Sequence, residues 1–97
     1  GEYYMKRKNY RAAVSRFRGA LKFKPNDALA TIRLAEALEK SWFATPEKYR
    51  QRQSLDEAAK YYSLYLDILP NGDYAIEAKA ALERLDAAEQ AAAAPSR

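Results

Sequence analysis

Apolar and small residues return every three or four positions along most of this chain, which is the spacing of amphipathic helices. Before residue 9, a short helical stretch is expected from Glu2 to Lys8. The next helix is expected to begin after Asn9, whose side chain can cap it, and to end before Pro25. Its inward positions are Tyr10, Ala13, Val14, Phe17, Ala20 and Leu21, and its water-facing positions are Arg11, Arg16, Arg18 and Lys22.

The same spacing predicts further helices downstream. Asp27 is expected to cap a helix that begins at Ala28, and a last helix is expected from about Asp73 to Glu89. The inward positions are Thr31, Leu34, Ala35 and Leu38, then Leu55, Ala58, Ala59, Tyr62, Tyr65, Leu66 and Leu69, and finally Tyr74, Ala78, Ala81, Leu82 and Leu85. No segment alternates with the period of two that strands require, so the predicted fold class is all-α.

One spacing occurs twice. Ala13-x3-Phe17-x2-Ala20-x4-Pro25-Asn26 returns 45 residues later as Ala58-x3-Tyr62-x2-Tyr65-x4-Pro70-Asn71. A helix that repeats and ends in the same way is typical of stacked antiparallel helical hairpins, an architecture that usually holds another protein. Tyr65 stands where the first copy has Ala20, so either the helix contact opens there or the tyrosine points elsewhere.

These residues resemble the tetratricopeptide repeat family, whose pattern is W-x2-L-G-x2-Y and then A-x3-F-x2-A-x4-P. The matches are Gly1, Tyr4, Ala13, Phe17, Ala20 and Pro25 in one repeat, and Leu34, Ala35, Leu38, Ala58, Tyr62 and Pro70 in the next, with Thr31 in place of the tryptophan. The resemblance implies a helical domain over 1–90, with repeat one at 1–26, repeat two at 27–71 and a capping helix at 73–89. The alanine-rich tail at 91–97 is expected to fray. A narrower resemblance is to the BamD-like proteins of bacterial envelope assembly, on Glu2-Tyr3-Tyr4-Met5-Lys6-Arg7 and Pro70-Asn71 with Tyr74.

An insert lengthens the second repeat. Gly1 to Ala35 spans the family's period of 34 residues, whereas Pro25 to Pro70 spans 45, so eleven extra residues fall near 42–52. Thr45-Pro46-Glu47 carries the signals of a helix start, which favours one long helix from Pro46 to Leu69. Ser54-x-x-Glu57 is a competing capping box, which would start the helix near Ser54.

The residue composition limits the reactions that this chain could catalyse and the metal sites that it could form. The 97 residues include no cysteine and no histidine, which excludes thiol and histidine catalysis and the metal sites those residues form. We therefore expect no enzyme activity and no cofactor. Residues 1–25 carry eight basic side chains against one acid, whereas residues 54–97 carry four against eight. Opposite ends are expected to attract, within a stack or between molecules, unless the charges only solvate the helices.

Two surfaces are candidate binding sites. In the repeat architecture the first helix of each hairpin lines a groove, which here comprises Glu2, Met5, Lys6, Leu29, Ile32, Arg33, Glu36 and Glu39. The tip of the lengthened hairpin carries Trp42, Phe43, Tyr49, Arg50 and Arg52, a mixture enriched at interface hot spots. The alternative is that the aromatic residues of the tip pack on one another and on Tyr65.

The leading functional hypothesis is a protein–protein interaction scaffold that binds a peptide or a partner helix. The alternative is self-association through exposed hairpin faces or helix exchange. Nucleic-acid binding is less favoured, because the basic residues scatter around two helices and no nucleic-acid motif accompanies them. We expect no small-molecule substrate and no transmembrane segment. The sequence leaves a bacterial envelope location and a cytoplasmic one both open.

Overall fold

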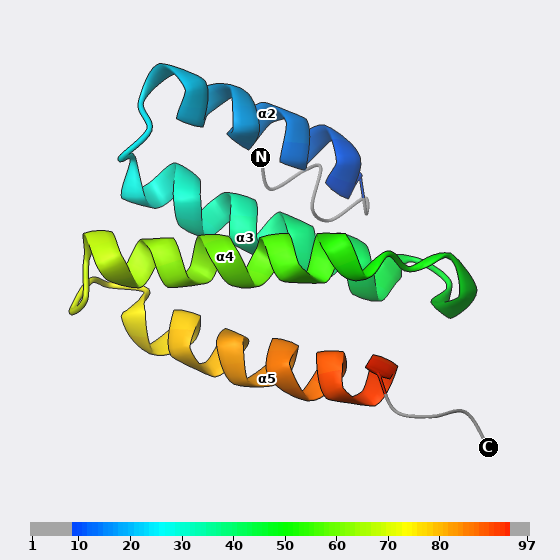
Figure 1. Ribbon diagram of the computed structural model, residues 1–97. Helices are drawn as coiled ribbons and strands as arrows, with labels where there is room; N and C mark the ends of the chain where they lie inside the picture. The colour runs from blue at the N-terminus through cyan, green and yellow to red at the C-terminus, as the bar shows by residue number, and fades with distance from the viewer. Residues whose placement is uncertain (1–8, 94–97) are drawn as a thin grey trace.

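The computed structural model describes residues 9–93, and these form helices connected by short turns (Figure 1). The α-helices are α2 (Tyr10–Phe23), α3 (Ala28–Ala44), α4 (Arg52–Ile68) and α5 (Ala75–Ala93). A short 3-10 helix, η1 (Glu47–Tyr49), lies between α3 and α4. No strand occurs within residues 9–93, so the predicted all-α class is confirmed. The stretch expected from Glu2 to Lys8 lies outside the described residues.

The beginnings of the first two helices follow the predicted caps. The side chain of Asn9 accepts a hydrogen bond from the backbone N–H of Ala12, and that of Asp27 accepts one from Ala30 at 3.1 Å. Each bond satisfies one of the N–H groups that the first turn of a helix leaves unpaired. The last residue of α2 is Phe23, two residues before Pro25, as expected.

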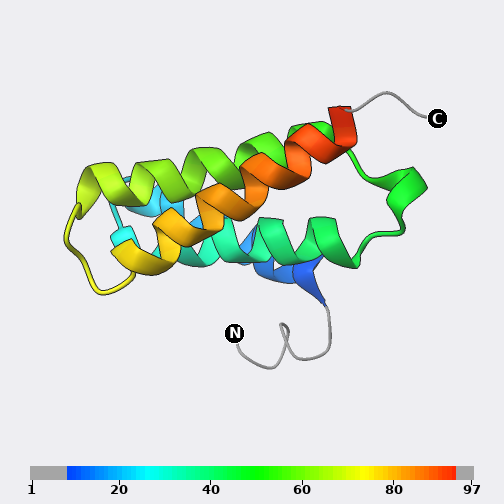
Figure 2. The same ribbon diagram turned by 90° about the horizontal axis from the view of Figure 1, so that it is seen from below.

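Consecutive helices pack side by side, α2 on α3, α3 on α4 and α4 on α5 (Figures 1 and 2). The largest part of the core comes from α3, which lies between its neighbours and buries side chains on several sides. The core cluster contains Ile32, Leu34, Ala35, Leu38, Trp42, Leu55, Ala58, Tyr62, Tyr65, Ala75, Ala78, Ala81 and Leu85. Phe17, Leu21 and Val14 of α2 pack against this cluster from one side.

The prediction of one long helix from Pro46 to Leu69 is wrong, because the chain turns back between Ala44 and Arg52. The hydroxyl of Thr45 donates to the carbonyl of Ser41 in the last turn of α3, so this residue ends a helix and does not start one. The start predicted near Ser54 is closer, but α4 begins at Arg52. The N–H of Ser54 donates to the carbonyl of Gln51 in its first turn.

The last helix is shifted toward the C-terminus relative to the prediction. It begins at Ala75, and Tyr74 precedes it with its N–H bonded to the hydroxyl of Tyr65 at 3.0 Å. The tail expected to fray from residue 91 is helical to Ala93, because alanine favours the helix more than any other residue. Residues 94–97 lie outside the described part of the chain.

Candidate functional site

Five residues that are exposed or partly exposed lie along one face of α3 and are called the α3 row: Leu29, Arg33, Glu36, Lys40 and Phe43. Their spacing of four, three, four and three keeps them on one face of the helix. The ends are apolar and open to water, with 53% of Leu29 and 45% of Phe43 exposed. The row is about 21 Å long, since a helix rises about 1.5 Å per residue.

Arg33 is held in a defined orientation in the middle of this row. Its guanidinium donates to Glu36 at 2.9 Å and to the hydroxyl of Tyr74 at 3.2 Å, and it lies 5.1 Å from the Tyr74 ring centroid. The hydrogen bond to Glu36 raises the pKa of Arg33 above its ordinary value. Because Tyr74 leads into α5, this contact joins the two helices beside the row.

Glu39 does not face a groove, contrary to the prediction. Its carboxylate accepts a hydrogen bond from the hydroxyl of Tyr62 at 2.6 Å and two from Arg84 at 2.9 and 3.1 Å. Only 7% of Glu39 is exposed, because α4 and α5 supply both of these partners. Burial, reinforced by the bond to Glu39, raises the pKa of Tyr62 and keeps its hydroxyl protonated as a donor.

Of the other residues predicted to line the groove, Leu29, Arg33 and Glu36 belong to the α3 row. Ile32 is 1% exposed and belongs to the core cluster, so its groove position is also wrong. Beyond the row, Ala44 at the end of α3 is also exposed. The predicted groove residues Glu2, Met5 and Lys6 lie outside the described residues.

The hairpin tip separates into structural and exposed residues. Trp42 is 8% exposed, and its Nε1 donates to the carbonyl of Gln51 at 3.1 Å. Arg50 lies 4.6 Å from the Trp42 ring centroid and donates to the carbonyls of Trp42, Thr45 and Phe43. The carbonyls of Trp42 and Phe43 belong to the last turn of α3 and that of Thr45 to its C-cap, so Arg50, together with Trp42, fixes the turn that follows the helix.

Phe43 and Tyr49 of the hairpin tip are much more exposed than Trp42. Phe43 packs edge-on against Trp42 at 5.0 Å but stays partly exposed, and Tyr49 is 65% exposed. Tyr65, expected as a possible partner, packs on Tyr74 at 6.2 Å. Arg52 starts α4 and lies 3.8 Å from Glu89 of α5, so it faces the neighbouring helix. The aromatic residues therefore pack on one another only in part.

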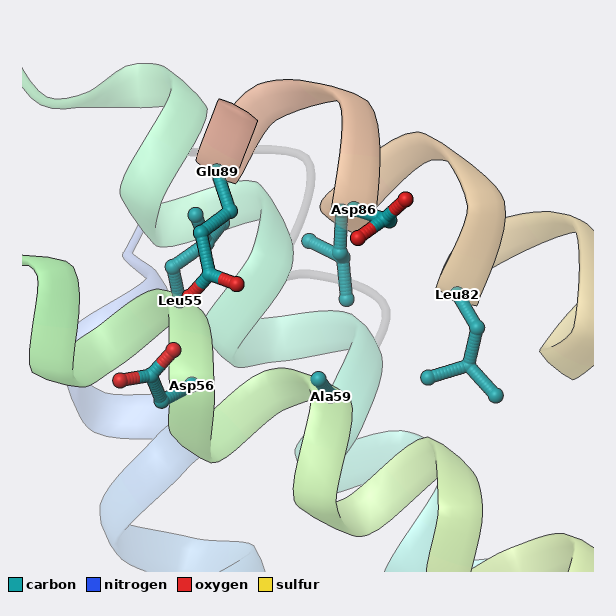
Figure 3. Close-up of a pocket in the computed structure, with 7 residues that line it drawn as sticks. Leu55, Asp56, Ala59, Leu82, Asp86 and Glu89 are labelled. Carbon is teal, nitrogen blue, oxygen red and sulfur yellow. The ribbon is translucent and has the colours of Figure 1, made fainter. Parts of the chain in front are cut away.

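A hollow between α4 and α5 was not predicted (Figure 3). It has a volume of about 240 Å³ and an apolar floor made by Leu55, Ala59, Leu82 and Leu85. Its rim carries three carboxylates, those of Asp56, Asp86 and Glu89. A hydrogen bond to Asp56, together with the negative charge of Asp56, raises the pKa of Glu89. Within residues 9–93, no group of acidic side chains is arranged to hold a metal ion.

The sequence could have predicted the full α3 row but not the hollow between α4 and α5. Lys40 and Phe43 follow Glu36 by four and seven residues, so the row could have been extended by helical spacing alone. The hollow depends on how α5 lies against α4, which spacing does not specify.

Comparison with protein-family models, curated proteins and solved structures finds no match to this chain. Among the helices that the structure describes, none has the length and apolar character needed to cross a membrane.

Proposed function

We propose that this chain is a protein–protein interaction module of the tetratricopeptide type, which binds a peptide or a partner helix along the α3 row. The observation that carries the proposal is the row itself. Among the described helices, α3 has the most buried residues, yet one of its faces stays at least partly open to water, with apolar ends and charges between them. Such a surface suits a segment that lies along it and anchors an apolar side chain at each end.

The repeat assignment is supported by the correspondence between α3 and α5. Both helices follow a Pro-Asn turn, and Ala75 begins α5 47 residues after Ala28 begins α3. At this offset three of the four buried residues of α5 correspond to buried residues of α3. The pairs are Thr31 with Ala78, Leu34 with Ala81, and Leu38 with Leu85. Corresponding burial in two helices is expected where one structural unit occurs twice.

Fixed geometry also supports a binding role for the α3 row. Arg33 is oriented by Glu36 and Tyr74, so a partner carboxylate would meet a guanidinium that has already lost part of its rotational freedom. A surface arranged before binding loses less conformational entropy when the partner arrives. Lys40 is exposed beside it and adds a second positive charge.

Selection from a displayed peptide library tests this function. Peptides enriched on the natural chain should bind at least about tenfold more weakly to the double variant Leu29→Ser/Phe43→Ser, since a buried apolar anchor contributes about 1.5–3 kcal/mol. The matched control is Phe23→Ser, which removes an exposed aromatic residue from α2 and should leave peptide affinity unchanged. Failure to enrich any peptide, or equal binding to all three proteins, would remove the proposal.

A further inference from the structure

The end of α2 presents a fully exposed phenylalanine between two lysines. Phe23 is 95% exposed, and Lys22 and Lys24 flank it at the last turn of the helix. Helix α2 carries four basic residues and no acidic one, and only Arg18 among them forms an ion pair within residues 9–93. We call Phe23, Lys22 and Lys24 the basic knob. A partner that covers this ring would remove its apolar surface from water, and the two lysines place positive charge beside it.

The hollow between α4 and α5 has the complementary chemistry. Its floor is apolar, with Leu55 and Leu85 almost entirely buried and Ala59 and Leu82 partly open. Its three carboxylates crowd one another, and among the described basic residues only Arg52 reaches one of them, at 3.8 Å from Glu89. The volume of about 240 Å³ accommodates one aromatic ring. Figure 3 shows Leu55, Asp56 and Ala59 on α4 facing Leu82, Asp86 and Glu89 on α5.

The knob and the hollow do not meet within one molecule. Helix α2 packs on α3, α3 on α4 and α4 on α5, so α2 and α5 are the two outer helices of the stack (Figures 1 and 2). Phe23 lies at the end of α2 next to the α2–α3 turn. The hollow lies toward the opposite end, near Arg52 and Glu89.

We propose that Phe23 of one copy of this chain docks in the α4–α5 hollow of a second copy. The two lysines of the knob then lie against Asp56, Asp86 and Glu89, and the phenyl ring covers the leucine floor. Because knob and hollow are different surfaces, each contact leaves one free knob and one free hollow. Such head-to-tail contacts add copies in a row instead of closing at a dimer.

Light scattering on the purified chain over a range of concentrations tests the contact. The average mass should rise with concentration and fall as salt is added, because salt screens exposed charge pairs. Phe23→Ala should weaken association by about tenfold or more, since it removes the aromatic anchor. Phe43→Ala removes a similar side chain from another surface and should leave association unchanged. A chain that stays monomeric at every concentration would overturn the proposal.

A mixing experiment distinguishes this contact from any other. Phe23→Ala keeps an intact hollow, and Asp86→Lys/Glu89→Lys keeps an intact knob, so each variant alone should be monomeric. Their mixture should form a complex of two copies and stop there. Recovery of larger assemblies, or no complex on mixing, would contradict the head-to-tail arrangement. Circular dichroism checks that both variants are folded, which is expected because all three positions are at the surface.

This inference is independent of the α3 row. The double variant Leu29→Ser/Phe43→Ser should still associate, and Phe23→Ala should still bind any selected peptide. The two proposals can therefore fail separately.

Discussion

The turn between α4 and α5 has no room for a side chain at Gly72. A Cβ atom added there would collide with the hydroxyl of Tyr65 and lie 2.8 Å from the Cβ of Leu69. Tyr65 is 1% exposed, and its hydroxyl accepts the N–H of Tyr74, so it has little freedom to move away. We expect Gly72→Ala to lower the free energy of unfolding by about 2 kcal/mol, the usual effect of overpacking.

Gly19 is the matched control, because an added Cβ there meets nothing within 4 Å. It lies inside α2, where alanine favours the helix by about 1 kcal/mol over glycine, so Gly19→Ala should stabilise the protein. Urea denaturation of both variants measures the difference. Equal effects at the two glycines would show that the contact with Tyr65 does not constrain the turn.

The hydrogen bond from the N–H of Tyr74 to the hydroxyl of Tyr65 shows where the Tyr65 side chain points, which the sequence left open. Its ring enters the core, and its hydroxyl reaches past the end of α4 to the residue before α5. Spacing alone placed Tyr65 inward but left its contact undecided. The answer depends on a backbone N–H nine residues away, which no helical period specifies.

At the scale of the helices, one ion pair links α2 to a helix that does not follow it in the chain. Arg18 donates two hydrogen bonds to Glu57 of α4, at 2.7 and 2.8 Å. These bonds lower the pKa of Glu57 below its unfolded value. The stabilisation is therefore complete above the unfolded pKa of about 4.5 and is lost as the pH falls through the lower, folded value.

We expect Glu57→Gln to remove about 0.5–1 kcal/mol at neutral pH, a modest effect because both side chains are partly exposed. The difference in unfolding free energy between the natural chain and this variant should shrink as the pH falls from about 5 to 3. Denaturation at a series of pH values measures it. Asp67→Gln, at an exposed acidic residue of the same helix, is the control and should keep a nearly constant difference. A Glu57 difference that does not change with pH would exclude the ion pair as its source.

Helix beginnings could be predicted where the deciding contacts are local. Asn9 and Asp27 bond to N–H groups three residues ahead, so the sequence carries the whole signal. The connection from α3 to α4 is decided by Trp42 and Arg50, which bond to groups five to nine residues away. The Thr45-Pro46-Glu47 signal is weaker than those contacts and produces only a 3-10 turn.

At the scale of the whole molecule, the candidate site depends on how the helices pack as well as on spacing. Leu29, Arg33 and Glu36 share a face of α3, which follows from helical spacing alone. Whether each residue of that face is open to water depends on α4 and α5. Glu39 and Ile32 became buried because those helices and the core cover them, and the sequence does not encode that coverage locally.

Glu39, Tyr62 and Arg84 join three helices through one buried carboxylate, and their interaction can be measured. Arg84→Met leaves that carboxylate without its cation, which should cost about 1–2 kcal/mol of unfolding free energy, because the Arg84 side chain is 56% exposed and water screens the pair. Tyr62→Phe removes one donor and should cost about 1–2 kcal/mol. The double variant Glu39→Met/Arg84→Met removes both charges but leaves the Tyr62 hydroxyl without its acceptor, so it should recover only part of the Arg84→Met loss.

The comparison distinguishes an ion pair from simple packing. If Arg84 acted mainly through its aliphatic stem, the methionine that replaces it would keep that packing and Arg84→Met alone would change little. If the effects of Glu39→Met and Arg84→Met simply added in the double variant, the carboxylate and the guanidinium would not interact. Chemical denaturation of the natural chain, the two single variants and the double variant completes the cycle, and hydrogen exchange along α5 shows whether the loss is confined to that helix. Because Glu39 bonds to α4 and α5 together, we expect exchange to increase in all three helices at once.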